Sequence, residues 1–462
     1  MDSENKNVIF KNKQKGIKLV AVMKTKVLQF YLDNIKPYSD KIPYFRELAG
    51  IVWRVIWKLR LTLKSIWLSV DLEKIYWINP QKIIYGLEKS ALIVPEYKEQ
   101  EKKLFKLGKL ELYIVEFEDK IIYQSFYQHF IKGKQWEETD LYKKDANRIK
   151  GGRSLWCCSS VDDYNKRCNM LDKLYDDIKQ NGINTQKELK KNSILKENRI
   201  KEIENEMTVY IGSEGELINH NGQHRLSIAK LLILDKVPVQ ILYRHKNWLK
   251  FRKEILTYIR RETKGKALQP LLHPDLSDIP SLWSDKRFKM IKQNLTTKKG
   301  TLLDIGAHWG YFCHKFEDIG FRCTAMEGSM RNLYFMKKLK RAERLNFNII
   351  SKSIFDYKDF EDFEDNLNFD VVLVLNLFNQ FVDIEKKDLY SKFAEIFGKI
   401  KAKEMYFQIP EHEVMQQLQK TGEYKNRSFS SQALIDFVIK NTHFTYAEKI
   451  GEERNHGIYK LY

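Results

Sequence analysis

The spacing of apolar and polar positions predicts a mixed α/β segment between residues 70 and 262. Leu171, Leu174 and Ile178 fall on one face of a predicted helix over 163–181, which Asn181-Gly182 ends. Apolar and β-branched runs predict short strands on both sides of this helix. These strands are at 107–117, 207–211, 216–220 and 237–243, with extended chain at 71–84, a charged helix at 187–204 and a helix from Gly222 to Leu232.

A different pattern begins after residue 263. The segment 264–299 contains Pro270, Pro274 and Pro280 and few long apolar runs, so it is predicted to be an interdomain connector with one helix near 288–295. From residue 301 to the C-terminus, strand patterns and helix patterns alternate. Such alternation is typical of βαβ units and predicts a parallel, Rossmann-like sheet.

The first 70 residues are strongly basic. They contain 14 Lys and Arg residues against five Asp and Glu, a net charge of +9. Trp53, Ile56 and Trp57 recur at helical spacing, while Arg54 and Lys58 fall mainly on another side. Two interpretations stay open: a helix lying on an anionic membrane surface, or an amphipathic helix docked on the next domain.

Composition narrows the classes of protein without choosing a partner. Of 462 residues 43% are hydrophobic and 31% are charged, which allows a packed core and excludes global disorder. The net charge of +20 favours an anionic partner such as a nucleotide, a nucleic acid, a phosphorylated glycan or an acidic membrane. A genome rich in lysine codons would give the same charge with no such partner.

The cysteines and the N-terminal sequence favour a cytoplasmic location, with association at the membrane periphery left open. No cysteine pair has the two-residue spacing of a zinc site, so no metal site is predicted and all five thiols are expected to be reduced. The first fifteen residues are polar, which argues against a signal peptide. No run of about 18 apolar residues occurs, so no spanning helix is expected.

The most specific motif runs from Thr301 to Gly310. A short apolar strand enters a turn with Gly306 and Gly310, a helix follows over 311–318, and a second strand over 321–326 ends at Glu327. Glycines at this edge let a ligand approach the backbone, and an acid after the second strand can accept both hydroxyls of a ribose. The spacing differs from G-x-G-x-x-G, which favours a mononucleoside cofactor over a dinucleotide.

Residues 302–462 resemble the class I S-adenosylmethionine-dependent methyltransferases. The resemblance implies that Asp304, Gly306 and Gly310 hold the methionine end of S-adenosylmethionine and that Glu327 binds the ribose. The other residues that it implies are Asp356 near the adenine, with Ser353 in the position usual for that acid, and His308, Asn376 and Asn379 as catalytic candidates at the pocket mouth. The Asn-Pro-Pro-Tyr motif is absent, which disfavours methylation of adenine N6 or glutamine.

The middle motif surrounds Gly222-Gln223-His224-Arg225, at a predicted helix start after a β-hairpin. Free backbone N–H groups and a guanidinium at a helix start can bind phosphate. The stretch resembles the ParB/sulfiredoxin-like superfamily, in particular uncharacterised ParB-like proteins found beside surface-glycan genes. The resemblance implies nucleotide binding, of ATP or CTP with Mg²⁺, by Gly222, His224 and Arg225. Gln223 replaces the reactive cysteine of sulfiredoxin, and a capped helix whose Arg225 pairs with a carboxylate stays an alternative.

These patterns together predict a multidomain protein. Its parts are a basic helical N-terminal arm (1–70), an α+β ParB-like domain (71–262), a connector (263–298) and a Rossmann-like α/β methyltransferase domain (299–462). The leading hypothesis is methyl transfer to a small molecule, a sugar or a glycan intermediate, with a nucleotide-binding accessory domain. Two alternatives stay open: a protein that binds or modifies DNA, and a ParB-fold phosphotransferase with a regulatory methyltransferase-like domain.

Overall fold

The computed structural model describes residues 74–87, 114–185, 188, 206–354, 368–375, 388–410 and 431–462. The chain divides into two units, Met1–Ile75 and Tyr76–Tyr462, and the second unit contains both sheets except for Ile75, the first residue of β1. The predicted basic arm and charged helix lie outside the described residues, as do Asp356, Asn376 and Asn379.

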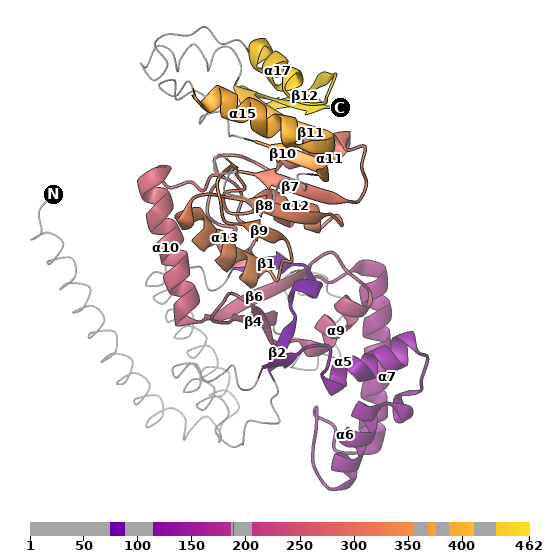
Figure 1. The fold of residues 1–462 in the computed structure, drawn as a ribbon. Helices are drawn as coiled ribbons and strands as arrows, with labels where there is room; N and C mark the ends of the chain where they lie inside the picture. The colour runs from indigo at the N-terminus through magenta and orange to yellow at the C-terminus, as the bar shows by residue number, and fades with distance from the viewer. Residues whose placement is uncertain are drawn as a thin grey trace, which may run out of the picture. The chain divides into compact units, whose positions relative to one another are not determined.

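The middle part of the chain folds around a mixed six-stranded sheet with the order β1-β6-β4-β5-β2-β3 (Figure 1). β4 pairs antiparallel with β5 and parallel with β6, so the predicted hairpin is present. Its strands are β1 (Ile75–Ile78), β2 (Tyr85–Leu87), β3 (Ile114–Glu116), β4 (Met207–Ile211), β5 (Leu217–Asn221) and β6 (Val237–Arg244).

Helices from two sequence regions pack on this sheet. The long helix α7 (Val161–Asn181) begins at a reciprocal cap between Ser160 and Asp163 and ends at Gly182, whose φ of 72° suits glycine. The predictions of this helix and of α9 (Gln223–Leu231) are confirmed. The other helices are α5 (Ile121–Phe126), a π-helical turn η4 (Tyr127–Ile131), α6 (Asp140–Lys150) and α10 (Lys246–Glu262), with short 3-10 turns η1 (Pro80–Lys82), η5 (Trp136–Glu138) and η8 (Pro274–Leu276).

The C-terminal sheet has seven strands in the order β12-β13-β11-β10-β7-β8-β9. β9, β8, β7, β10 and β11 are parallel, and β13 inserts antiparallel between β11 and β12. This is the Rossmann-like α/β sheet that the alternating pattern predicts. The strands are β7 (Thr301–Ile305), β8 (Arg322–Met326), β9 (Asn348–Ile350), β10 (Asn368–Val374), β11 (Lys401–Pro410), β12 (Ala447–Glu453) and β13 (His456–Leu461).

Helices cover both faces of the C-terminal sheet, so its central strands are buried on both sides. On one face Leu302 and Leu373 pack against α11 and α12, and on the other Leu303 and Val372 pack against α15 and α17. This two-sided burial explains the nearly continuous apolar strands. The helices are α11 (Lys286–Asn294), α12 (Tyr311–Glu317), α13 (Met330–Ala342), α15 (Asp388–Lys399) and α17 (Ser431–Lys440).

The proline-bearing segment after α10 is packed. Ala267, Leu271 and Leu276 are buried in the hydrophobic core of the middle sheet. Asp275 is fully buried and accepts hydrogen bonds from Arg244 Nε at 2.7 Å and from Trp248 Nε1 at 2.9 Å. The segment is therefore held by apolar contacts and by a buried ion pair. The predicted helix within 264–299 is confirmed as α11.

None of the described helices combines the length and the apolar character needed to cross a lipid bilayer.

Candidate functional site

A well-defined cavity lies at the carboxyl edge of the C-terminal sheet. It has a volume of about 340 Å³ and is lined by the ends of β7, β8 and β10 and by the loop after β9. The strand order reverses between β7 and β10, because β8 and β9 lie on one side of β7 and β11 lies beyond β10 on the other. Ligands of open α/β sheets bind at such a reversal, and the volume suits a small cofactor.

The glycine turn forms one wall of the cavity. Gly306 and Gly310 have φ angles of 76° and 82°, and both conformations favour glycine. The amides of Gly306 and Ala307 donate to the carbonyl of Met326 at 2.9 and 3.0 Å, which ties the turn to the end of β8. Gly310 opens α12, and an added Cβ there would lie 3.0 Å from Phe347. Gly310 is therefore needed both for the turn and for close packing.

Glu327 joins the two loops that border the cavity. Its carboxylate accepts the amide of His308 at 2.9 Å and the amide of Ser329 at 2.8 Å. Each carboxylate oxygen has a further lone pair, so the same side chain can also accept two hydroxyl groups from the cavity. The acid predicted to bind ribose thus also fixes the glycine turn, a role that the sequence did not indicate.

Asp304 lies beneath the glycine turn and does not line the cavity. Its side chain is buried, and Oδ2 has no hydrogen-bond partner among the described residues. Burial raises the pKa of Asp304 to about 7, although the nearby Arg287 opposes this rise. A buried carboxyl oxygen without a hydrogen-bond partner, at the end of β7, is chemically suited to a hydrogen-bond donor of a ligand.

The sequence did not single out Arg287, which is buried near Asp304. Its guanidinium stacks over the ring of Trp283 at 4.3 Å and donates to Gln408 Oε1 at 3.0 Å. Nη2 makes no hydrogen bond within the described residues, and burial lowers the pKa of Arg287 to about 10. A buried guanidinium with an unused N–H group is suited to a carboxylate.

The pKa of Asp304 leads to a test of stability. A carboxyl whose pKa is raised in the folded state binds a proton more tightly when folded, so stability should fall between about pH 4 and pH 7. Asp304→Asn removes this dependence. In urea unfolding, the stability of the variant relative to the wild type should rise by about 2.7 kcal/mol between pH 5 and pH 8. Parallel stability curves for the two proteins would contradict the assignment.

His308 lies at the centre of the turn and lines two cavities. Its φ of 53° is uncommon outside glycine, and its ring stacks on Trp309 with centroids 5.0 Å apart. Burial lowers its pKa to about 4, so the imidazole is neutral at pH 7. A neutral imidazole that faces a cavity can take up a proton from a hydroxyl or amine group of a bound ligand.

Several residues that line the main cavity had no assigned role. Leu268 and Gln269 come from the proline-bearing segment, and Asn332 comes from the first turn of α13. Lys352 and Ser353 follow β9, where an adenine would be expected from the resemblance. Leu268 and Gln269 could not be found from the sequence, because only the path of the folded chain brings that segment over the sheet edge.

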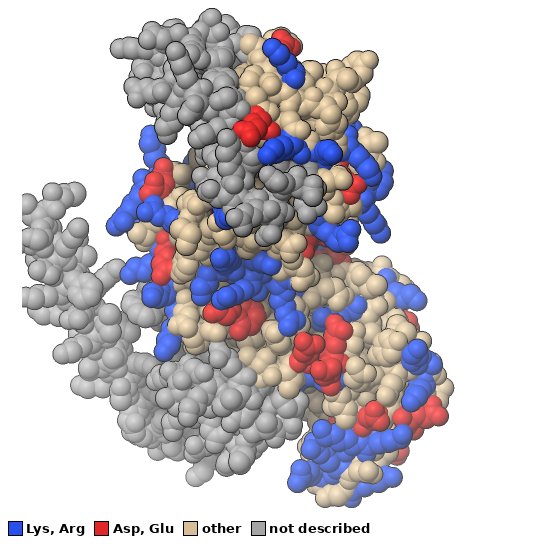
Figure 2. Space-filling model, viewed as in Figure 1, with Lys and Arg blue, Asp and Glu red and all other residues tan. Residues whose placement is uncertain are grey.

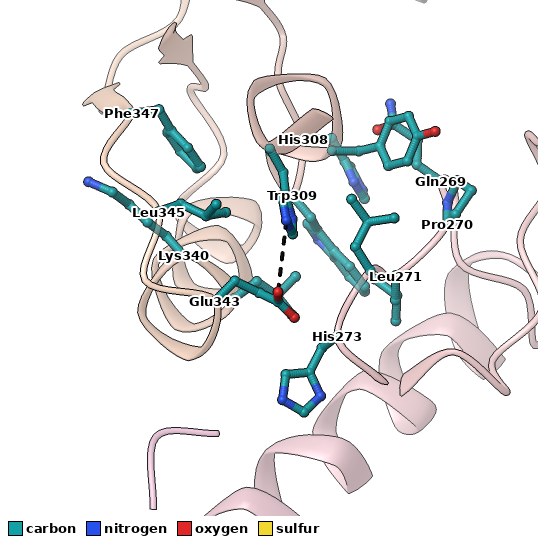
Figure 3. A pocket seen from close by; sticks show the side chains of 15 residues that line it. Gln269, Pro270, Leu271, His273, His308, Trp309, Lys340, Glu343, Leu345 and Phe347 are labelled. Carbon is teal, nitrogen blue, oxygen red and sulfur yellow. Dashed lines mark ion pairs between the residues drawn. The ribbon is translucent and has the colours of Figure 1, made fainter. Parts of the chain in front are cut away.

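A smaller cavity of about 30 Å³ adjoins the glycine turn, as Figure 3 shows. Figure 3 shows His308, Trp309, Leu271 and His273 around it, and marks an ion pair at Glu343. That contact places Glu343 3.8 Å from His314 of α12, and burial lowers the pKa of His314 to about 4, so its imidazole is neutral at pH 7 and does not neutralise the carboxylate. The space suits one or two water molecules, so this cavity is not a second cofactor site.

The middle motif lies at the start of α9, apart from the residues that line the cavity. An added Cβ at Gly222 would lie 2.5 Å from Met207, so the close approach at this glycine is to β4. His224 is packed 5.7 Å from Phe126 and 5.2 Å from Trp156, and burial lowers its pKa to about 3. Burial also lowers the pKa of Arg225, and the nearby Glu206 carboxylate opposes this. The predicted nucleotide contacts of these residues stay a prediction.

The described residues include no group of three or more His, Cys, Asp or Glu side chains placed to hold a metal ion.

No protein-family model matches the sequence. No curated protein matches it significantly. Among solved structures, monomeric WbdD is 15% identical over 45% of this chain and 48% of its own, with a TM-score of 0.35. A second similar structure is that of WbdD as a bifunctional kinase-methyltransferase. The match spans about half of the WbdD chain.

Two smaller methyltransferase structures are also similar to part of the chain. The N-methyltransferase NodS from Bradyrhizobium japonicum is 12% identical over 38% of this chain and 93% of its own, with a TM-score of 0.29. The methyltransferase domain of a bacterial Hen1 is 13% identical over 38% and 97%, with a TM-score of 0.30. The resemblance of the middle domain to ParB-like proteins stays a prediction.

Proposed function

We propose that this protein is an S-adenosylmethionine-dependent methyltransferase whose donor occupies the cavity of about 340 Å³. The observation that carries the proposal is the position of Glu327, a buried carboxylate at the end of β8 that borders this cavity and joins both of its loops. The glycine turn after β7 and the orphaned oxygen of Asp304 support it.

In this proposal the two ends of the donor meet different groups. Glu327 accepts the ribose hydroxyls, and the loop with Lys352 and Ser353 borders the adenine. Asp304 and Arg287 carry opposite charges and lie close enough that each shifts the pKa of the other. Neither side chain lines the cavity, so the proposal requires the glycine turn to shift for the amino-acid end of S-adenosylmethionine to reach them. Their charges then suit the ammonium and the carboxylate of that end.

The donor supplies a methyl group on a positively charged sulfur. The chain's own residues then have to orient an acceptor in line with that methyl group and exclude water. His308 is the described residue placed to accept the proton that a hydroxyl or amine acceptor loses. Asn376 and Asn379 are proposed for the same region on the basis of the sequence resemblance.

The acceptor class that we propose is a small molecule, a sugar or a glycan intermediate. This part rests on the resemblance of residues 70–262 to ParB-like proteins of surface-glycan gene clusters. Transfer of a tritiated methyl group to sugar nucleotides and oligosaccharides, with duplex DNA as the comparison, tests it. Label in DNA alone would contradict this acceptor class and favour a DNA-modifying protein.

Calorimetric titration of the full chain with S-adenosylhomocysteine tests donor binding. We expect one site per chain, and weaker binding of adenosine and of methionine when each is added alone, because each ligand contacts only one end of the site. The absence of binding by the folded protein would overturn the proposal. Equal binding of adenosine and S-adenosylhomocysteine would contradict the role of Asp304 and Arg287.

A further inference from the structure

The middle domain contacts the helix that follows β8 along its whole length. In the second turn of α13, Tyr334 donates to Glu254 of α10 at 2.7 Å, and the ring of Phe335 lies 5.3 Å from that of Tyr258. Near its end, Lys338 pairs with Glu214 at 3.4 Å. α13 begins at Ser329 and Asn332, which line the main cavity.

The tip of the β4–β5 hairpin touches the far end of the same helix. Gly215 has a φ of 104°, and an added Cβ would lie 2.4 Å from Trp248 and 2.6 Å from Ala342. Glu214 pairs with α13 side chains, and Glu216 accepts the amide of Glu214 at 2.8 Å. These hairpin carboxylates therefore hold the helix and the turn in place.

Lys82, at the end of η1, reaches both helices that begin at the cavity loops. Its ammonium donates to Glu343 at 2.8 Å, just after α13, and lies 3.1 Å from His314 Nε2 in α12. Glu343 is buried with only 4% of its side chain exposed, and Lys82 is 31% exposed. Lys82 is not among the residues that line the main cavity.

We propose that Lys82 is a positioning residue of the donor site: it ties α12 and α13 together from the middle domain and so fixes the two loops that border the cavity. The expected effect of Lys82 on donor affinity rests on the proposed function. Its expected effect on the order of α12, α13 and the loops before them rests on the contacts alone. A buried carboxylate that loses its cation is poorly tolerated, so the helices would separate without Lys82. Small displacements of a site from distant substitutions can reduce its function strongly.

Lys230 offers a matched control. Its ammonium is also in an ion pair, 2.9 Å from Glu118, and its side chain is 1% exposed. This pair lies within the middle domain, and among the described residues no hydrogen bond or ion pair joins either side chain to α12 or α13. Lys230→Met therefore removes a buried cation of the middle domain without changing the contacts between α12 and α13. Lys82→Arg keeps a positive charge beside Glu343.

The first measurement is hydrogen exchange of the full chain without ligand. Lys82→Met should speed exchange at the amides of 306–314 and 329–342 by about tenfold, and Lys230→Met should leave these amides unchanged. The second is affinity for S-adenosylhomocysteine, which Lys82→Met should weaken about tenfold, while Lys82→Arg restores most of it and Lys230→Met has no effect.

The two measurements separate the two proposals. Unchanged exchange at both segments in Lys82→Met overturns the positioning role, whatever the ligand does. Faster exchange at these segments in Lys82→Met, together with no binding of S-adenosylhomocysteine by the wild type, supports the positioning role and overturns the proposed function. An equal loss of affinity in Lys82→Met and Lys230→Met would show a general effect of lost stability and would also overturn the positioning role.

Discussion

Glu327→Gln should weaken binding of S-adenosylhomocysteine by roughly a hundredfold. At the proposed donor site the substitution would remove the charge from two hydrogen bonds to ribose hydroxyls, and charge-assisted bonds contribute about 1.5–3 kcal/mol each. It also places an amide N–H group against a backbone N–H group, because both carboxylate oxygens already accept amides of the cavity loops. Calorimetry on the full chain measures the effect.

Glu317 provides the control for this prediction. Its carboxylate also accepts a backbone amide, that of Asn346, at 3.0 and 3.2 Å, but it does not line the cavity. Glu317→Gln should leave the affinity within about twofold of the wild type, because it changes no group at the donor site. Similar affinities for Glu327→Gln and the wild type would place the ribose elsewhere.

Asp275→Ala should lower the free energy of unfolding by about 3–5 kcal/mol. The side chain is fully buried and pairs with Arg244, whose own side chain is 1% exposed, at 2.7 Å. Removing one partner of a buried ion pair leaves a charge without compensation, and here the indole N–H of Trp248 also loses its acceptor. Urea unfolding monitored by tryptophan fluorescence measures the change.

Asp278→Ala is the matched comparison. Asp278 is 44% exposed and pairs with Arg252, whose own side chain is 5% exposed but also donates to the backbone carbonyl of Asp275. Because water can reach the vacated position and Arg252 keeps this second acceptor, the effect should be smaller than that of Asp275→Ala, about 1–2 kcal/mol. If both substitutions lowered stability equally, the buried pair would have no special weight, and the proline-bearing segment would not be anchored as the structure indicates.

The local features of the sheet could be predicted because they depend on neighbouring residues. Apolar runs predict β7 and β8, and the glycines at 306 and 310 predict the turn, with left-handed conformations that few other residues tolerate. The acid at 327 was identified from its place after the second strand. Each of these inferences used a short stretch of sequence.

The remaining parts of the site depend on contacts between distant segments. Gln269 lines the cavity, but it belongs to the proline-bearing segment. The prolines predict irregular structure there and do not predict where the segment lies. In the sequence, Arg287 cannot be distinguished from a solvent-exposed cation on an amphipathic helix. In the structure, it is enclosed by Trp283, Phe312 and Gln408. The close approach of Gly222 is to Met207, fifteen residues earlier in the chain, and residue type alone cannot distinguish this from approach to a phosphate.

Trp309, Phe335 and Ala342 are part of the hydrophobic core of the middle sheet, although they belong to the C-terminal part of the chain. A protein cut at the connector would expose these side chains on one fragment and their partners on the other. Segments that share a core melt together, so heating should give one calorimetric transition for residues 76–462. A change in either sheet would then alter the stability of both, and in evolution the two parts would be inherited as a single folding unit.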